Sequence, residues 1–338
     1  MRPGRGGTGV QPIALGSNQP KDRFYRGGAR IADFRGEERG EEFQPEDWVA
    51  SCTEVAGEPG VGLTRLPDGR LLREAIAESP QEWLGPDHFA VFGTSTELLT
   101  KLLDAGERLP VHVHPDDAFA KECLGGHHGK AEAWLFLTDS SAHLGLVPGT
   151  TLDEIHRMIA EGDSETAVER MHRIEVRAGD VVYCPPGLPH AIGEGSFLVE
   201  IQQPSDLSVF LEWKSFPLPG GAGGHLGVSD AQAAGIVRGG MEAGDVDALR
   251  TADHKTHGDL LHGAEAPFRL ERLGGRDPVE QGYSVLFCVA GSGALTTSGN
   301  EPLRLSAGST ILIPWAAGKG SLLGDDRFEV VIARPPLP

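Results

Sequence analysis

Four residues, three histidines and one glutamate, have the side chains and the spacing of a metal-binding site: His112, His114, Glu132 and His190. In an extended strand successive side chains point to opposite faces, so His112 and His114 project from the same face and both imidazoles can reach one ion. The Pro-Pro-Gly segment at 185–187 is typical of a tight turn that directs His190 back towards them. Three imidazoles and one carboxylate suit zinc, iron, manganese, cobalt or nickel, and the ligand types alone do not choose among these metals.

Short β-like runs separated by turn residues fill most of the chain, as its 47 glycines and 24 prolines also indicate. Examples are an alternating run at 173–176 and apolar runs at 181–183 and 197–202. The region 151–172 has helical spacing instead and begins with a Thr-x-x-Glu capping box. Several leucines between 97 and 104 also fit one face of a helix, so periodicity alone predicts a helix there. The sequence therefore predicts a mainly β protein with a short helical insertion.

The second half of the chain repeats the rhythm of the first. The spacing from Gly308 to Pro314 is the same as that from Gly179 to Pro185, but no histidine follows at the matching place. Such an internal repeat favours two similar units, of which the second binds no metal. We therefore expect a flexible leader (1–20), a metal-bearing unit with the helical insertion near 151–172 (21–216), a linker rich in glycine and proline (217–224) and a second, metal-free unit (225–338).

The charge and the cysteines exclude several classes of protein. The formal net charge of −19 over 338 residues argues against binding to nucleic acid or to an anionic membrane surface, because both need clustered Lys and Arg. The four cysteines are widely spaced, so reduced thiols are expected. No apolar stretch has the length of a signal-peptide core or a membrane span. We expect a cytoplasmic protein, a monomer or weak homodimer, whose partner is a small molecule.

Several motifs resemble those of a known family. The His-x-His segment at 112–114 and the Pro-x-Gly-x2-His segment ending at 190 resemble the two conserved motifs of the cupins. More narrowly, four segments resemble the short bacterial type I phosphomannose isomerases: Thr-Lys-Leu-Leu-Asp-Ala at 100–105, Val-His-Pro-Asp-Asp at 113–117, Gly-Lys-Ala-Glu-Ala-Trp at 129–134 and Glu-Ile-Gln-Gln-Pro-Ser-Asp at 200–206. The resemblance implies two cupin-like β-barrels of jelly-roll type, and a strand instead of a helix at 98–104.

The resemblance also implies an activity. That family interconverts mannose 6-phosphate and fructose 6-phosphate through a cis-enediol, using one divalent metal ion that is usually zinc. The chain is thus expected to be a metal-dependent aldose–ketose isomerase that binds one zinc ion, with Mn, Fe, Co and Ni as alternatives.

The family's functional positions carry over one by one. Three of its ligands match His114, Glu132 and His190, and two lysines near its phosphate match Lys101 and Lys130. Glu200 and Gln202 share one strand face and are expected at the pocket, although a structural hydrogen bond explains each equally well. We expect catalytic roles for Lys130, Glu200 and Lys214, and substrate contacts from Lys101, Lys130, Gln202 and Asp206.

Three positions depart from the family pattern. A glutamine ligand of the family is His112 here, and a serine near the phosphate is Pro110. The arginine that the family places near its catalytic centre is Phe210, which offers neither charge nor a hydrogen-bond donor. Lys214 and Lys121 are the basic residues nearest in sequence that could substitute for it.

Other functions therefore stay open. The same scaffold could act on an unphosphorylated sugar or sugar derivative, which the changes at Pro110 and Phe210 favour. A non-catalytic, sugar-sensing metal-binding cupin is a second alternative. An oxygenase that holds Fe(II) with three histidines and a glutamate is a third.

Overall fold

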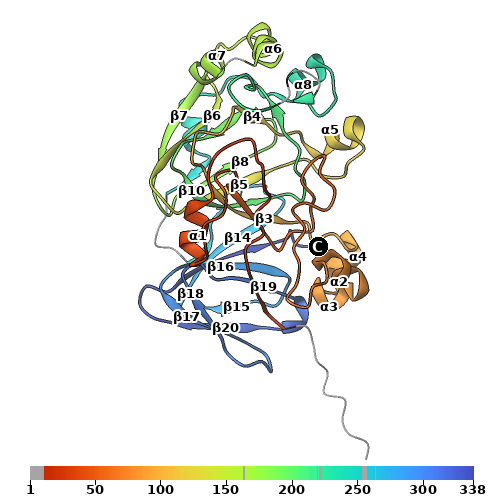
Figure 1. Cartoon of the computed structure of the whole chain (residues 1–338), viewed down its shortest axis with the longest axis vertical. Helices are drawn as coiled ribbons and strands as arrows, with labels where there is room; N and C mark the ends of the chain where they lie inside the picture. The colour runs from red at the N-terminus through yellow and green to blue at the C-terminus, as the bar shows by residue number, and fades with distance from the viewer. Residues whose placement is uncertain (1–10, 163, 219, 221–222, 253–256, 263) are drawn as a thin grey trace, which may run out of the picture.

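The structure is a computed structural model that describes residues 11–338, apart from residues 163, 219, 221–222, 253–256 and 263. It is mainly β, and its strands form four sheets, here called sheets I to IV. Figure 1 shows the strands of the first half of the chain towards one end of the long axis and those of the second half, in blue, towards the other.

Sheets I and II contain most strands of the first half. In spatial order, sheet I consists of β12 (Arg250–Thr251), β8 (Val181–Cys184), β5 (Glu132–Phe136), β10 (Phe197–Gln202), β3 (Leu99–Asp104) and β2 (Glu46–Val49). Sheet II consists of β11 (Val209–Phe210), β4 (His112–Val113), β9 (His190–Ile192), β6 (Ser140–Leu146) and β7 (Met171–Val176).

Sheets III and IV contain the strands of the second half together with the first strand of the chain. Sheet III consists of β1 (Ile13–Leu15), β19 (Thr310–Ile313), β16 (Ser284–Ala290), β21 (Glu329–Arg334), β14 (Arg269–Gly274) and β13 (Gly258–Asp259). Sheet IV consists of β15 (Pro278–Val279), β20 (Gly320–Gly324), β17 (Ser292–Thr297) and β18 (Leu303–Ser306).

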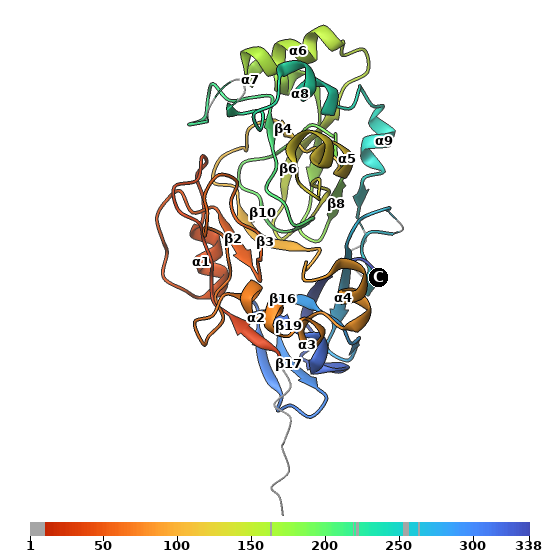
Figure 2. The same ribbon diagram turned by 90° about the vertical axis from the view of Figure 1, so that its right-hand side faces the viewer.

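The helices are short and lie outside the sheets. They are α1 (Ala29–Arg35), α2 (Leu72–Glu78), α3 (Pro80–Trp83), α4 (Pro86–Phe92), α5 (Asp117–Phe119), η1 (Ala120–Leu124), α6 (Leu152–Glu161), α7 (Ser164–Glu169), α8 (Asp230–Ile236), α9 (Ala243–Asp247) and η3 (Trp315–Ala317). Helices α6 and α7 are found where the sequence predicted a helical insertion, and α6 begins with the expected capping box of Thr151 and Glu154. Figure 2 shows α6, α7 and α8 together at one end of the molecule. Among the described residues, no helix combines the length and the apolar character that crossing a membrane requires.

The periodicity-based prediction of a helix at 97–104 is wrong, whereas the strand implied by the family resemblance is present. All six residues of β3 are buried. Leu102 belongs to the core cluster shared with sheet III, and Leu103 belongs to the cluster between sheets I and II. A strand covered on both faces carries a nearly continuous apolar run, which leucine spacing alone does not distinguish from a buried helix.

The sheets stack in the order II, I, III, IV. Side chains of sheets I and II meet in one core cluster, which includes Leu198 and Leu144. The other face of sheet I packs on sheet III, where Val199 shares a cluster with Phe287. Sheets III and IV enclose a further cluster that includes Leu286. Successive residues 198 and 199 of β10 thus face different layers, as strand alternation requires.

Two strand pairings cross the segment boundaries that the sequence predicted. Residues 13–15 of the predicted leader form β1, which pairs with β19. Residues 250–251, beyond the predicted linker, form β12, which pairs with β8 of sheet I. Within the described pairings each sheet has two end strands, so the hydrogen bonds between strands do not by themselves show a closed barrel in either half. The division at 217–224, where residues 219, 221 and 222 lie outside the described part, stays a prediction, as do the two barrels.

Candidate metal centre

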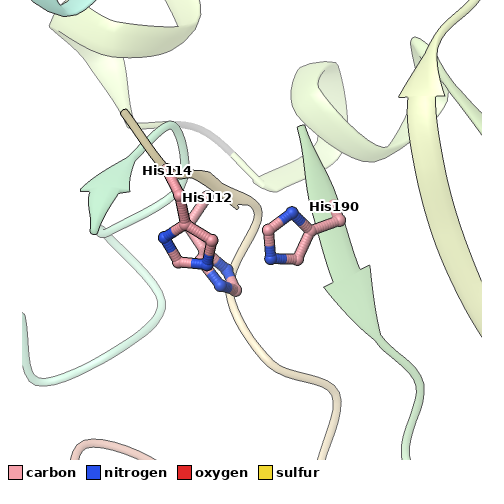
Figure 3. A group of neighbouring side chains, drawn as sticks. All are labelled: His112, His114 and His190. Carbon is pink, nitrogen blue, oxygen red and sulfur yellow. The ribbon is translucent and has the colours of Figure 1, made fainter. Parts of the chain in front are cut away.

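The three histidines converge on one point, His112 from β4, His114 from the residue just after β4, and His190 from the neighbouring strand β9, as Figure 3 shows. His112 in β4 is the direct cross-strand partner of His190 at the start of β9. His114 is two residues beyond His112, so its side chain returns to the same face, whereas Val113 between them is part of the core on the other face. The His-x-His segment therefore has the geometry that its spacing predicted.

The imidazole rings are close enough to share one ion. The ring centroids of His112 and His190 are 4.2 Å apart, those of His114 and His190 4.8 Å, and those of His112 and His114 4.9 Å. One ring nitrogen of each histidine lies within 4.8 Å of the corresponding atoms of the other two.

Hydrogen bonds fix which ring nitrogen of each histidine is free. The Nδ1 atom of His112 lies 2.8 Å from the carbonyl oxygen of Pro110, that of His114 2.7 Å from the oxygen of Leu207, and that of His190 2.8 Å from the oxygen of Leu188. Because a carbonyl oxygen only accepts, each Nδ1 carries the proton and donates it. Each Nε2 then presents a lone pair, as metal-ligating histidines do.

Glu132 reaches the same point from sheet I. Its Oε1 atom lies 3.1 Å from Nε2 of His114, and its Oε2 atom lies 3.5 Å from Nε2 of His190. Lys130 also touches this group, because its Nζ atom is 2.7 Å from Oε1 of Glu132 and 3.4 Å from Nε2 of His114. The four predicted ligands are thus brought together between sheets I and II, with a cation beside them.

Burial sets the protonation states of these four groups. It lowers the pKa of His112 and His190, and it lowers the pKa of His114 to about 3 with help from nearby Lys130. Burial alone would raise the pKa of Glu132, but Lys130 and His114 outweigh it and hold that pKa well below its usual range. Neutral imidazoles and an ionised carboxylate are the forms that bind metal.

The turn before β9 positions His190. Gly187 has φ 83°, in the left-handed region that favours glycine, and the N–H of Leu188 donates to the carbonyl of Pro185 at 3.2 Å. The N–H of Gly187 donates to the carbonyl of His114 at 2.8 Å. The turn is therefore tied to the end of the His-x-His segment, which explains why the Pro-x-Gly motif brings His190 to it.

A cavity of about 400 Å³ lies beside the candidate metal centre, within the size range of small-molecule sites. Two of the candidate ligands, His112 and Glu132, contribute to its lining. Its charged lining residues are Asp22, Arg23, Glu46, Glu58, Lys101, Lys130, Glu132, Glu200 and Asp206. Carboxylates outnumber cations in this set.

A buried ion-pair network forms one wall of the cavity. Nζ of Lys101 lies 3.3 Å from Glu46 and 3.3 Å from Glu200, and it stands 4.6 Å above the ring of Trp48. The hydroxyl of Tyr25 and the indole N–H of Trp48 each donate to Glu46 at 2.7 Å. Glu46 thus has three donors around one carboxylate.

The two carboxylates of this network differ in proton affinity. Burial would raise the pKa of Glu46, but Lys101 and the hydrogen bonds from Tyr25 and Trp48 lower it to about 2. Burial, together with the charge of Glu132, raises the pKa of Glu200 to about 7. Of these two carboxylates, Glu200 is the one whose pKa lies near neutral pH.

Of the other predicted site residues, Asp206 lies at the cavity, whereas Gln202 and Lys214 do not. Asp206 lines the cavity and accepts a hydrogen bond from the N–H of Ala56 at 3.0 Å. Gln202 does not belong to the cavity lining. Its amide donates a hydrogen bond to the carbonyl of Ser205 at 2.6 Å, so it has the structural role that the sequence analysis gave as the alternative to a pocket contact. Lys214 is exposed, with its Nζ 5.9 Å from the ring of Trp213, so the structure does not bring it to the centre.

Phe210 lies at the cavity, beside the metal centre. Its ring is 6.0 Å from that of His112 and 5.4 Å from that of Phe24. Pro110 contributes the carbonyl that orients His112, so this position acts through its backbone. Neither of the nearby lysines takes the place of the family arginine, since Lys121, like Lys214, is exposed and outside the cavity lining.

Sequence reasoning missed several residues at the site. Cys184 is buried, with Sγ 3.2 Å from Nδ1 of His190, and its Sγ lies within 4.8 Å of possible ligand atoms of Glu132 and His190. Tyr25, Glu46 and Arg23 reach the cavity from the N-terminal segment. Nothing local in the sequence indicated that these four residues belong to the site.

Known proteins resemble this chain in part of their sequence. No protein-family model matches it. A mannose-6-phosphate isomerase of Streptococcus mutans is 40% identical over 135 residues, which are 38% of this chain and 41% of that protein. The mannose-6-phosphate isomerase ManA of Bacillus subtilis is 39% identical over 117 residues, 34% of this chain and 36% of that protein. The matched stretches thus span about two fifths of these relatives.

Solved structures match nearly the whole chain. The mannose 6-phosphate isomerase of Bacillus subtilis superposes with a TM-score of 0.72 at 23% identity, covering 96% of this chain and 100% of that one. The apo mannose 6-phosphate isomerase of Salmonella typhimurium gives a TM-score of 0.72 at 16% identity, covering 97% and 100%. The fold is that of these isomerases, and the resemblance that the motifs indicated is confirmed.

Proposed function

We propose that the protein is a metal-dependent aldose–ketose isomerase that interconverts mannose 6-phosphate and fructose 6-phosphate. The observation that carries the proposal is the meeting of two groups in one cavity: the candidate metal ligands His112 and Glu132, and the buried pair of Lys101 and Glu200. The fold shared with mannose-6-phosphate isomerases and the partial sequence match to such enzymes support the same activity.

The side chains at the centre fit one divalent ion, for which we propose zinc. His112, His114, Glu132 and His190 would hold it, because the three Nε2 atoms are unprotonated and the carboxylate is ionised. In addition, Nε2 of His190 is buried and has no hydrogen-bond partner among the described residues. A bound divalent ion supplies Lewis-acid stabilisation of negative charge that develops on substrate oxygens.

The isomerisation moves one proton between two neighbouring carbons of the sugar, so it needs a group that accepts the proton and returns it. Glu200 is our candidate, because it lines the cavity and its pKa of about 7 is close to the value at which a general base works best near neutral pH. Burial opposes the charge of Lys130, but Glu132 raises the pKa of this lysine above its ordinary value. Lys130 therefore stays protonated and can donate a hydrogen bond to a substrate oxygen.

We infer that the protein has the two-barrel architecture implied by the family resemblance. Sheets I and II would form a metal-bearing barrel of cupin type, and sheets III and IV a metal-free one, with the division near 217–224. A cytoplasmic location and a monomeric or weakly dimeric state are part of the proposal. The reduced state of the four cysteines is consistent with that location.

The activity can be tested directly. Purified protein loaded in turn with Zn, Mn, Co, Ni or Fe is assayed for conversion of mannose 6-phosphate to fructose 6-phosphate and of mannose to fructose. We expect turnover of the phosphorylated sugar, lost in Glu200→Gln with the metal retained. An enzyme that converts only the free sugars would contradict the proposed substrate, and one that converts no sugar with any metal would contradict the proposed activity.

An isomerase of unphosphorylated sugars is the second candidate. The specific observation in its favour is Phe210, which places an aromatic ring at the cavity where the family has an arginine. The two assays above separate these candidates.

A further inference from the structure

A phosphorylated substrate needs a cation that is able to leave its present partner. The described residues of the cavity lining include three cations: Lys101, Lys130 and Arg23. Lys101 and Lys130 are buried, and their ion pairs are with the buried carboxylates of Glu200 and Glu132. Drawing either lysine towards a phosphate would leave a carboxylate charged and unpaired in the interior, which is strongly unfavourable.

Arg23 has a different partner. Its guanidinium pairs with Glu58 through Nη2, and its Nε donates to the carbonyl of Lys21 at 3.2 Å. The side chain of Arg23 is 11% exposed, whereas that of Glu58 is 44% exposed. The cation is thus held at the cavity while nearly half of its carboxylate partner is exposed, and solvent screens an ion pair with an exposed partner more than it screens a buried pair.

Glu58 also has room to move. It lies in a turn in which the N–H of Glu58 donates to the carbonyl of Val55 at 3.0 Å and the N–H of Val61 donates to the carbonyl of Glu58 at 3.1 Å, so its backbone stays in place when its carboxylate leaves Arg23. Glu58 also lines a second cavity, of about 650 Å³, whose lining does not include Arg23. Its carboxylate can turn away from Arg23 without entering an apolar environment.

The segment that carries Arg23 covers the position where the family arginine is replaced. Phe24, the next residue in the chain, packs edge-on against Phe210 at 5.4 Å between ring centroids. The backbone N–H of Arg23 is anchored to the carbonyl of Phe43 at 3.1 Å. The aromatic contact therefore holds residues 23–24 against the cavity wall formed by Phe210.

We propose that Arg23 binds the phosphate group of a sugar phosphomonoester, exchanging Glu58 for the phosphate when the substrate enters. The planar guanidinium can donate two parallel hydrogen bonds to phosphate oxygens, which a lysine cannot reproduce. The sugar end of such a ligand would lie towards His112 and Glu132, which line the same cavity. This assignment of the reacting end rests on the proposed isomerase function, whereas phosphate binding by Arg23 does not.

The test compares Arg23→Ala and Arg23→Lys with wild type. Kinetics are measured on mannose 6-phosphate and on mannose, and binding of inorganic phosphate is measured by calorimetry in the metal-free and the metal-loaded protein. The control is Arg73→Ala, which removes an exposed arginine 2.8 Å from Glu54 and outside the cavity lining. For Arg23→Ala we expect KM for the phosphorylated sugar to rise and phosphate affinity to fall roughly 10- to 100-fold, as for a lost charged hydrogen bond, with turnover of mannose and thermal unfolding unchanged.

Further results separate this proposal from the proposed function. Arg23→Lys should regain part of the loss, and Glu58→Gln should tighten phosphate binding about 2- to 5-fold by removing the competing carboxylate. Equal phosphate affinity in wild type and Arg23→Ala would overturn the proposal, even in an active isomerase. If wild type isomerises no sugar but binds inorganic phosphate through Arg23, the proposed function fails and the phosphate site stands.

Discussion

At the scale of single residues, the candidate metal centre depends on three histidines whose Nδ1 atoms are all engaged by carbonyl oxygens. Replacing His190 with alanine removes the Nε2 that faces Glu132 and should abolish stoichiometric zinc binding. Loss of a residue that merely orients a ligand weakens binding about 10- to 100-fold, so loss of a ligand should cost more. Metal analysis after dialysis measures this, with His128→Ala as the control, since His128 pairs with Glu97 at 3.4 Å. Full zinc content in His190→Ala would refute the ligand assignment.

Phe210 offers a test of gained function. An arginine at this position would add a fourth cation to the three in the described cavity lining. The ring of Phe210 lies 6.0 Å from that of His112, measured between ring centroids, so the new side chain would start beside the metal centre. Phe210→Arg should lower KM for mannose 6-phosphate about 10-fold, as for one charged hydrogen bond, and should restore phosphate affinity in the Arg23→Ala background. Steady-state kinetics of the single and double variants measure the effect. Unchanged KM in both would show that position 210 does not contact the phosphate.

Because of Glu46, the free energy of unfolding should depend on pH in the acid range. Its pKa is lowered from an ordinary value of 4.5 to about 2, so it contributes about 3 kcal/mol above pH 4.5, which is lost as the pH falls towards 2. Glu46→Gln removes this contribution, so the stability difference between wild type and variant should be largest at neutral pH and should shrink between pH 4.5 and 2. Denaturant unfolding across this range measures it. A difference that stays constant with pH would mean that Glu46 is not charged in the folded protein.

The sequence predicted the ligand residues better than their surroundings, for a physical reason. His-x-His and Pro-x-Gly are local patterns whose backbone geometry follows from spacing alone, and both have the predicted conformation. Tyr25, Glu46 and Arg23 reach the cavity only because the N-terminal segment folds across sheet I. Such contacts between distant parts of the chain leave no periodic signal in the sequence.

At the scale of elements, the helical insertion is attached to the strand that carries Phe210. The carbonyl of Gly162, which ends α6, accepts hydrogen bonds from the N–H groups of Trp213 at 3.2 Å and Lys214 at 3.1 Å, a few residues beyond β11. The capping box and the apolar spacing predicted the helix. They did not predict this attachment, which depends on glycine at the helix end.

A glycine substitution tests this attachment. Gly162 has φ 59°, and a Cβ there would overlap the indole of Trp213. Gly149 has φ 83° but open space around the same position, so Gly149→Ala measures the backbone strain alone, about 1–2 kcal/mol. Gly162→Ala should be less stable than Gly149→Ala by a further 1–3 kcal/mol, roughly the cost of overpacking, in thermal or denaturant unfolding. Equal losses would show that Trp213 moves aside freely.

At the scale of the whole molecule, the stacked sheets join the two halves through a common core. The internal repeat predicted two similar units, but it did not reveal that the outer face of sheet I is buried against sheet III. Val199 and Ile201 of β10 share this core with Phe287 and Val331 of the second half. The same strand β10 carries Glu200 on its other face, so packing between the halves supports the position of a proposed catalytic group.

This shared core predicts that the molecule unfolds as one unit. Leu286 is buried between sheets III and IV, remote from sheet I, and Leu286→Ala should cost about 2–5 kcal/mol as a cavity-forming substitution. Because sheet III supports sheet I, the variant should release bound zinc at the same lowered temperature at which the second half unfolds. Calorimetry gives the unfolding transition, and a zinc-sensitive dye gives the temperature of release. If Leu286→Ala lowers the calorimetric midpoint of one transition while zinc is released at the wild-type temperature in a second, the halves are independent, and the packing between sheets I and III does not hold Glu200 in place.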